Sequence, residues 1–142
     1  MKTKYKNSGF AGEMLVAAEL SRLGYEVLLG NVGTTKTIGV DLAAVNPDSG
    51  KTTSISVKSL KKKNSFPIDP DKVRKDSVYV FVITNHANEL PDFFVVRGAT
   101  LLSIEQEVWG KWGRSYSPIH GRGIYSNKLE QWRNNWTTID EN

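Results

Sequence analysis

The chain has 142 residues and an ordinary globular composition, 39% hydrophobic and 24% charged, and its net charge of +4 permits a nucleic-acid partner without indicating one. The absence of cysteine excludes disulfides and thiolate metal sites, and two widely spaced histidines are too few for a typical zinc site. No apolar run approaches the roughly 20 residues of a membrane helix, and the basic N-terminus lacks the apolar core of a signal peptide. We therefore expect a single cytoplasmic domain over residues 1–142, with no membrane partner.

The first helix is predicted over residues 8–23. Asn7 or Ser8 can cap its start, and Gly24 stands where helices often end in the left-handed conformation. Glu13 falls inside the expected apolar stripe, where an acid costs free energy unless something satisfies it. It is therefore either directed at a site elsewhere in the chain or a boundary residue near the helix start that interacts favourably with the helix dipole. The stripe is expected to contain Phe10, Val16, Ala17, Leu20 and Leu23.

After a short strand over residues 25–29, the most informative stretch is a predicted hairpin with strands over residues 40–45 and 53–60. The turn between them, Asn46-Pro47-Asp48-Ser49-Gly50, is rich in turn formers. If it centres on Asp48 and Ser49, the numbers of opposite residues sum to 97, so Asp41 faces Ser56 and Lys58 lies one diagonal step away. The other face is apolar and defines the register. Its members are Val40, Leu42, Ala44, Ile55 and Val57.

Two further strands and two helices complete the predicted fold. The run over residues 77–84 is apolar on both faces and predicts an interior strand, paired as a hairpin with a strand over residues 93–97. A capping box beginning at Ser103 predicts a helix over residues 103–109 that stops at Gly110. Helical spacing predicts a last helix over residues 127–136 with a core stripe. Its members are Leu129, Trp132 and Trp136.

Basic residues concentrate in two segments. Six of the nineteen lie between positions 61 and 75, and the first three, Lys61, Lys62 and Lys63, directly follow the strand that carries Lys58. Such a run is often only a solvated loop, but this position favours contact with the phosphates of a polyanion. Arg114 and Arg122 lie in a glycine-rich segment that either holds phosphates or is an exposed connector.

The hairpin motif, Asp41 followed by Ser56-Val57-Lys58, resembles that of the PD-(D/E)XK nuclease superfamily. Gly12-Glu13 in the first helix also resembles this family. The likeness extends over most of the chain to small single-domain members with a GVDL strand, a YVFV strand and a C-terminal tryptophan. It implies a restriction-endonuclease-like fold of the α/β class, a mixed β-sheet flanked by α-helices. Ser56 departs from the motif, because that position usually carries Glu or Gln.

The resemblance implies a Mg²⁺- or Mn²⁺-dependent nuclease that hydrolyses phosphodiester bonds of nucleic acid, DNA rather than RNA. Asp41 would bind the metal directly, Glu13 would bind it through water or hydrogen-bond to its ligands, and Lys58 would orient the attacking water. Ser56 would hold a water through its hydroxyl. A homodimer would suit an enzyme that cuts two strands. Ser56 also leaves an alternative open: an inactive nucleic-acid-binding or protein-interaction module, in which Asp41, Lys58 and Glu13 form structural ion pairs.

Overall fold

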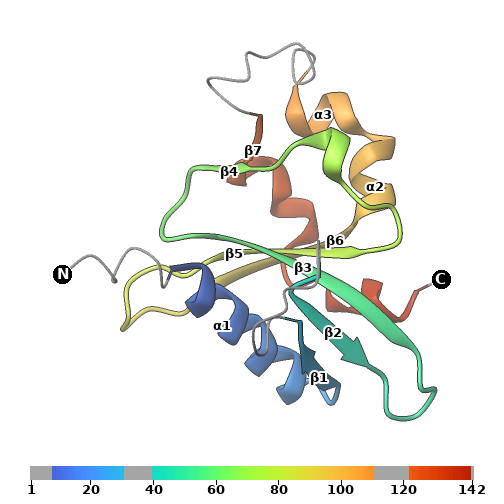
Figure 1. Cartoon of the computed structure of the whole chain (residues 1–142). Helices are drawn as coiled ribbons and strands as arrows, with labels where there is room; N and C mark the ends of the chain where they lie inside the picture. Colours follow the sequence, from blue (N-terminus) through green and yellow to red (C-terminus); the bar gives the residue numbers. More distant parts are fainter. Residues whose placement is uncertain (1–7, 31–39, 111–121, 142) are drawn as a thin grey trace.

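A five-stranded mixed sheet with the order β1-β2-β3-β5-β6 organises the molecule. The structure is a computed structural model that describes residues 8–30, 40–110 and 122–141 (Figure 1). The strands of this sheet are β1 Glu26–Leu29, β2 Leu42–Val45, β3 Thr52–Leu60, β5 Val78–Ile83 and β6 Asp92–Arg97. The first three form an antiparallel meander, β5 lies parallel to β3, and β6 pairs antiparallel with β5. The α/β class and the two predicted hairpins are thus confirmed.

Helices and a small second sheet cover the two faces of the main sheet (Figure 1). Helix α1 packs on one face, together with the last 3-10 helix, η5. The other face is covered by α2, α3, the 3-10 helix η4 and the two-stranded sheet of β4 and β7. These elements are α1 Ser8–Arg22, β4 Ser65–Pro67, η2 Pro70–Lys72, α2 Gly98–Ser103, α3 Glu105–Trp109, β7 Gly123–Tyr125, η4 Ser126–Trp132 and η5 Trp136–Asp140. Among the described helices, none is long and apolar enough to cross a membrane.

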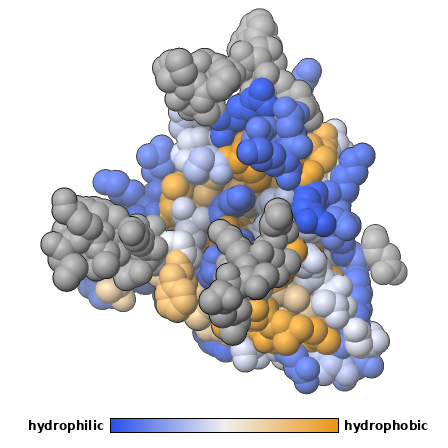
Figure 2. Space-filling view, in the orientation of Figure 1, coloured by the Kyte–Doolittle hydropathy of each residue, from blue (hydrophilic) through white to orange (hydrophobic). Residues whose placement is uncertain are grey.

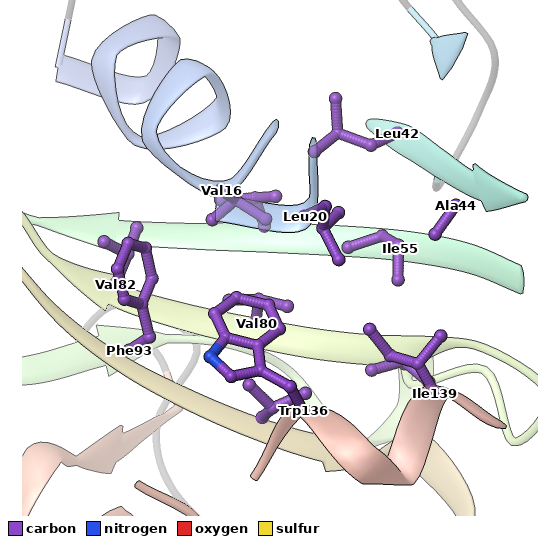
Figure 3. Packing of buried hydrophobic residues seen from close by; sticks show 13 residues of the cluster. Val16, Leu20, Leu42, Ala44, Ile55, Val80, Val82, Phe93, Trp136 and Ile139 are labelled. Carbon is purple, nitrogen blue, oxygen red and sulfur yellow. The ribbon is translucent and has the colours of Figure 1, made fainter. Parts of the chain in front are cut away.

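The core is divided by the sheet into two hydrophobic clusters. Every residue of β5 is buried, as predicted for an interior strand. Val78, Val80 and Val82 face α1, whereas Tyr79, Phe81 and Ile83 face α2 and α3. Figure 3 shows the first cluster, in which Val16 and Leu20 of α1 and Trp136 and Ile139 of η5 approach the same face of the sheet.

Helix α1 ends as predicted, but its buried face differs from the expected stripe. The Gly24 N–H donates to Ser21 O and the Tyr25 N–H to Leu20 O, both at 3.0 Å, and Gly24 has φ +101°, which is a Schellman cap. The expected burial of Phe10 and Leu23 is wrong, because they are 61% and 47% exposed.

The reason for this difference is a close approach at Gly12. A Cβ atom there would lie 1.7 Å from Ser59 Oγ and 3.1 Å from Val82 Cγ1. The backbone of α1 therefore touches β3 and β5 at Gly12. This contact turns Val16 and Leu20 toward the sheet and Phe10 away from it.

The predicted last helix over residues 127–136 is wrong: two 3-10 helices separated by a turn stand in its place. Between them Asn134 has φ +53°, its N–H donates to Phe93 O at 2.9 Å, and Asn135 Nδ2 donates to Val95 O at 3.1 Å. The chain thus crosses the outer edge of β6. Trp132 consequently packs on one face of the sheet and Trp136 on the other, so the expected stripe is core but belongs to two clusters.

The predicted helix over residues 103–109 begins two residues later, as α3, and the sequence does not predict the helix α2 that precedes it. Ser103 Oγ donates to Thr100 O at 2.7 Å, so this hydroxyl ends α2 and does not cap the next helix. Ile104 stands at the cap of α3 without a side-chain hydrogen bond. The stop at Gly110 is confirmed, with φ +86°.

At the opposite edge of the sheet, β1 leaves apolar side chains in solvent. Leu28 is 58% exposed and Leu29 is 45% exposed. In the space-filling view, hydrophobic surface gathers over this part of the molecule (Figure 2). The strand over residues 25–29 is nevertheless confirmed to within one residue.

Candidate functional site

The register of the central hairpin is the one predicted from the sequence. Leu42 pairs with Ile55 and Val45 with Thr52, so paired numbers sum to 97. The turn is held by Asn46, whose Oδ1 accepts from the Asp48 and Ser49 N–H groups at 2.9 and 3.2 Å. Local turn chemistry and the apolar face therefore agree on one register.

Asp41 leaves the regular strand pairing at the point where β2 begins. Its N–H donates to Ile55 O at 3.0 Å, and its carboxylate Oδ2 accepts from the Val57 N–H at 2.7 Å. The carboxylate thus takes the place of the backbone carbonyl on the β2 side that would otherwise accept from the Val57 N–H of β3. This side-chain bond explains why β2 starts at Leu42, whereas the sequence predicts a start at Val40. A charged acceptor makes it a strong hydrogen bond.

The backbone of Asp41 is also held from the side of β1. The Gly30 N–H donates to Asp41 O at 2.8 Å. A Cβ atom on Gly30 would lie 2.5 Å from Val40 O and 3.0 Å from Asp41 O, so a larger residue would displace this backbone. Asp41 is therefore fixed by β3 on one side and by Gly30 on the other.

The Val57 carbonyl lies on the same edge of β3 as Asp41. In a β-strand, the N–H and the C=O of one residue point toward the same neighbouring strand. Because the Val57 N–H bonds the Asp41 carboxylate, its carbonyl is directed to that side as well. The geometry thus brings two kinds of hard oxygen, a carboxylate and a peptide carbonyl, to one edge of β3.

Ser56 and Lys58 project from the face of β3 that is continuous with Tyr79 and Phe81 of β5. This face is opposite to the one on which α1 packs. Ser56 lies opposite Tyr79 and is 5% exposed, and Lys58 lies opposite Phe81 and is half-buried. Lys58 borders a cavity of about 500 Å³. Across the described residues, no ion pair within 4.0 Å joins the Asp41 carboxylate to the Lys58 ammonium. The structure therefore lacks the Asp41–Lys58 ion pair that an inactive module was expected to contain.

Glu13 is half-buried on α1, one residue after the glycine that touches Ser59 of β3. The start of α1 thus reaches the segment of β3 next to Lys58. Within residues 8–30, 40–110 and 122–141, no group of three or more acidic or histidine side chains is arranged to hold a metal ion. A metal in this region would depend on Asp41 and Glu13 for carboxylates, and Glu13 as a ligand stays a prediction.

The predicted basic residues do not share one environment. Lys61, Lys62 and Lys63 are all exposed after β3. Lys63, however, lies near Asp92: burial raises the pKa of that carboxyl, but hydrogen bonds from Asn85 and Arg133 and the charges of Arg133 and Lys63 outweigh it and lower the pKa. The charge of Lys63 is therefore partly compensated within the fold.

Arg122 is held by two carboxylates. Its Nη1 lies 2.8 Å from Asp69 Oδ1 and 2.9 Å from Asp71 Oδ2, and its side chain is 21% exposed. Contact of Arg122 with nucleic acid stays a prediction. Arg114 lies outside the described residues.

Sequence reasoning missed the part of the site formed by Lys72 and Tyr79. Both line the cavity next to Lys58. The sequence pattern predicts Tyr79 only as a core residue of an interior strand. In the structure its hydroxyl accepts a hydrogen bond from the Arg74 N–H at 2.9 Å. The signal that could have identified Lys72 was its place in the basic run over residues 61–75.

These elements form an α/β fold with a five-stranded mixed sheet, and a solved structure shares this fold. It is that of a bacterial homing endonuclease, I-Ssp6803I. The two superpose with a TM-score of 0.59 over 94% of this chain and 91% of the other, at 16% sequence identity, so the likeness concerns the fold. No protein-family model matches the sequence, and no curated protein matches it either.

Proposed function

We propose that this protein is a metal-dependent nuclease of the PD-(D/E)XK type that hydrolyses phosphodiester bonds in DNA. The observation that carries the proposal is the 2.7 Å hydrogen bond from the Val57 N–H to the Asp41 carboxylate. It fixes the acid against the strand segment that also carries Ser56 and Lys58. The similar fold of an endonuclease supports the same reaction class.

The donor set fits a hard divalent cation such as Mg²⁺ or Mn²⁺. Asp41 uses Oδ2 for the Val57 N–H, which leaves its second carboxylate oxygen, and the Val57 carbonyl lies on the same edge. Glu13 on α1 is the second carboxylate. Mg²⁺ needs only one or two carboxylates, with water and substrate oxygens completing its shell. When bound, the ion would acidify a water and stabilise negative charge on the phosphate.

The protein's own groups supply positioning and charge. Lys58 is half-buried and has no carboxylate partner among the described residues, so its ammonium is available to bond a phosphate oxygen and orient the attacking water. The Ser56 hydroxyl would hold a water on the same face of β3. Lys61 and Lys62, exposed just beyond Lys58, would contact neighbouring phosphates of the strand.

Calorimetric titration of Mn²⁺, followed by cleavage of duplex and single-stranded DNA and of RNA, tests this proposal. Wild type is expected to bind the metal and to cleave DNA, and Asp41→Asn and Glu13→Gln are expected to lose both properties. The matched controls are Asp48→Asn in the exposed turn and Glu19→Gln on the same helix, where Glu19 pairs with Arg22 at 3.5 Å. Cleavage by Asp41→Asn at the wild-type rate would refute the mechanism.

A second function is favoured by Ser56. This side chain is 5% exposed and neutral at a position where the nuclease motif carries Glu or Gln. A site with one carboxylate fewer holds a metal less tightly, which would suit a module that binds nucleic acid without cutting it. Salt-dependent DNA binding without metal-dependent cleavage would identify this function. Light scattering of the same samples, free and bound to duplex DNA, would show whether two copies act together.

A further inference from the structure

The cavity beside Lys58 contains groups that the proposed hydrolysis does not use. It has a volume of about 500 Å³, which is within the range of pockets that hold small molecules. Its wall combines three basic side chains, one acid and an apolar surface. The lining residues are Lys58, Pro67, Ile68, Asp69, Lys72, Tyr79 and Arg122.

The charges of this cavity do not cancel. Arg122 is compensated by Asp69 and Asp71, which contact its Nη1 at 2.8 and 2.9 Å. By contrast, neither Lys58 nor Lys72 forms an ion pair within 4.0 Å with any described carboxylate. Three cations, Lys58, Lys72 and Arg122, stand against two carboxylates, Asp69 and Asp71, so the cavity and its rim keep a net charge of +1. In Figure 2, hydrophilic side chains gather above the sheet, where Figure 1 places the segment around η2.

The wall that carries Lys72 is held in place by several hydrogen bonds. The Ile68 N–H donates to Arg122 O at 3.0 Å, and Trp109 Nε1 donates to Ile68 O at 2.9 Å. The Asp69 carboxylate caps η2 by accepting from the Asp71 N–H at 2.9 Å. Since this backbone is already ordered, a ligand would lose little free energy in organising it.

We propose that this cavity is a subsite for one nucleotide of the bound strand, adjacent to the phosphate that Lys58 contacts. Lys72 binds the phosphate of this nucleotide, and Pro67 and Ile68 provide an apolar surface for its sugar or base. A volume of about 500 Å³ accommodates more than a phosphate group alone. The identity of the ligand as nucleic acid rests on the proposed function.

Fluorescence anisotropy with labelled oligonucleotides in EDTA tests the subsite, because binding is then measured without metal and without cleavage. Lys72→Ala is expected to bind duplex DNA about tenfold more weakly near 0.1 M salt, and the negative slope of log K against log salt is expected to become smaller in magnitude by about 0.9, the loss of one phosphate contact. The matched control is Lys75→Ala, an exposed lysine of the same segment that does not line the cavity. It is expected to bind within about twofold of wild type.

The subsite and the nuclease function fail in different ways. Weaker binding by Lys72→Ala alongside a wild type that never cleaves with Mg²⁺ would support the subsite and refute the nuclease. A wild type that cleaves, with Lys72→Ala matching it in affinity and salt slope, would overturn the subsite and leave the nuclease intact. Equal losses in Lys72→Ala and Lys75→Ala would also overturn it, since the effect would then be general charge. Absence of oligonucleotide binding by wild type in EDTA would overturn it as well.

Discussion

Substitution of Asp41 separates its structural role from its chemical one. The carboxylate accepts the Val57 N–H at 2.7 Å at a half-buried position. Asp41→Ala removes this acceptor and leaves the N–H of Val57 without it. A hydrogen bond to a charged group contributes about 1.5–3 kcal/mol, so Asp41→Ala is expected to lower the free energy of unfolding by about that amount.

Asp41→Asn separates the two roles, because it keeps the hydrogen-bond acceptor and removes the negative charge. The amide oxygen still accepts from the Val57 N–H, so its cost is expected to be about 1 kcal/mol or less, while the negative charge needed for a metal is lost. Urea unfolding of both variants at pH 7 measures the difference, with an unchanged m value as the check that the unfolded state is the same.

Cleavage assays on the same two variants test the chemical role of the carboxylate. Both variants are expected to lose metal-dependent cleavage, although only Asp41→Ala is strongly destabilised. Equal stability of the two variants would refute the structural role assigned to the carboxylate. Full activity in Asp41→Asn would refute the chemical role.

Three further predictions concern packing, pH and charge. Gly12→Ala should destabilise the fold by about 1–3 kcal/mol in urea unfolding, because its Cβ would overlap Ser59. The control is Gly9→Ala on the same helix, where a Cβ would have nothing within 4 Å; this substitution should be neutral or stabilising. Burial and the hydrogen bond to Asp140 raise the pKa of Tyr25 to about 12, so the stability of wild type relative to Tyr25→Phe should be constant from neutral pH to pH 10 and fall as the pH rises from 10 to 12. A parallel pH dependence in the two proteins would contradict this assignment. Lys62→Glu should weaken DNA binding about tenfold or more at 0.1 M salt, with the difference shrinking at high salt; equal affinity would show that Lys62 is only solvated.

Local chemistry in the sequence is sufficient to predict the hairpin and the interior strand. Asn46 and Gly50 form a turn whose bonds reach only a few residues along the chain, and the alternation of apolar residues then allows one register. The same holds for β5, where six consecutive apolar residues predict a strand covered on both faces, and all six are buried. Because these features depend on neighbours in sequence, the amino-acid pattern alone predicts the pairing of Leu42 with Ile55, whereas the predicted pairing of Asp41 with Ser56 lies beyond the end of the regular ladder.

Helix faces and short helices are harder to derive, because their details depend on contacts between distant segments. Phe10 and Val16 are both apolar, and only the contact of Gly12 with Ser59 decides which of them is buried. Trp132 and Trp136 have helical spacing, yet the bond from the Asn134 N–H to Phe93 O takes the chain across the sheet edge between them. Helix propensity and the spacing of apolar residues do not predict hydrogen bonds between segments that are distant in the chain.

The placement of Ser56 and Lys58 on one face of β3 follows from the amino-acid pattern, whereas the position of Asp41, which lies outside the regular pairing with its carboxylate on the Val57 N–H, and the surroundings of the site follow from contacts that only the structure shows. The parallel pairing of β3 with β5 puts Tyr79 beside Ser56, and the ion pair of Arg122 with Asp69 brings two segments about fifty residues apart to one cavity wall. Parallel pairing and ion pairs of this kind join residues that are distant in the chain. Their free energy depends on the packed arrangement of the whole fold, which no local pattern specifies.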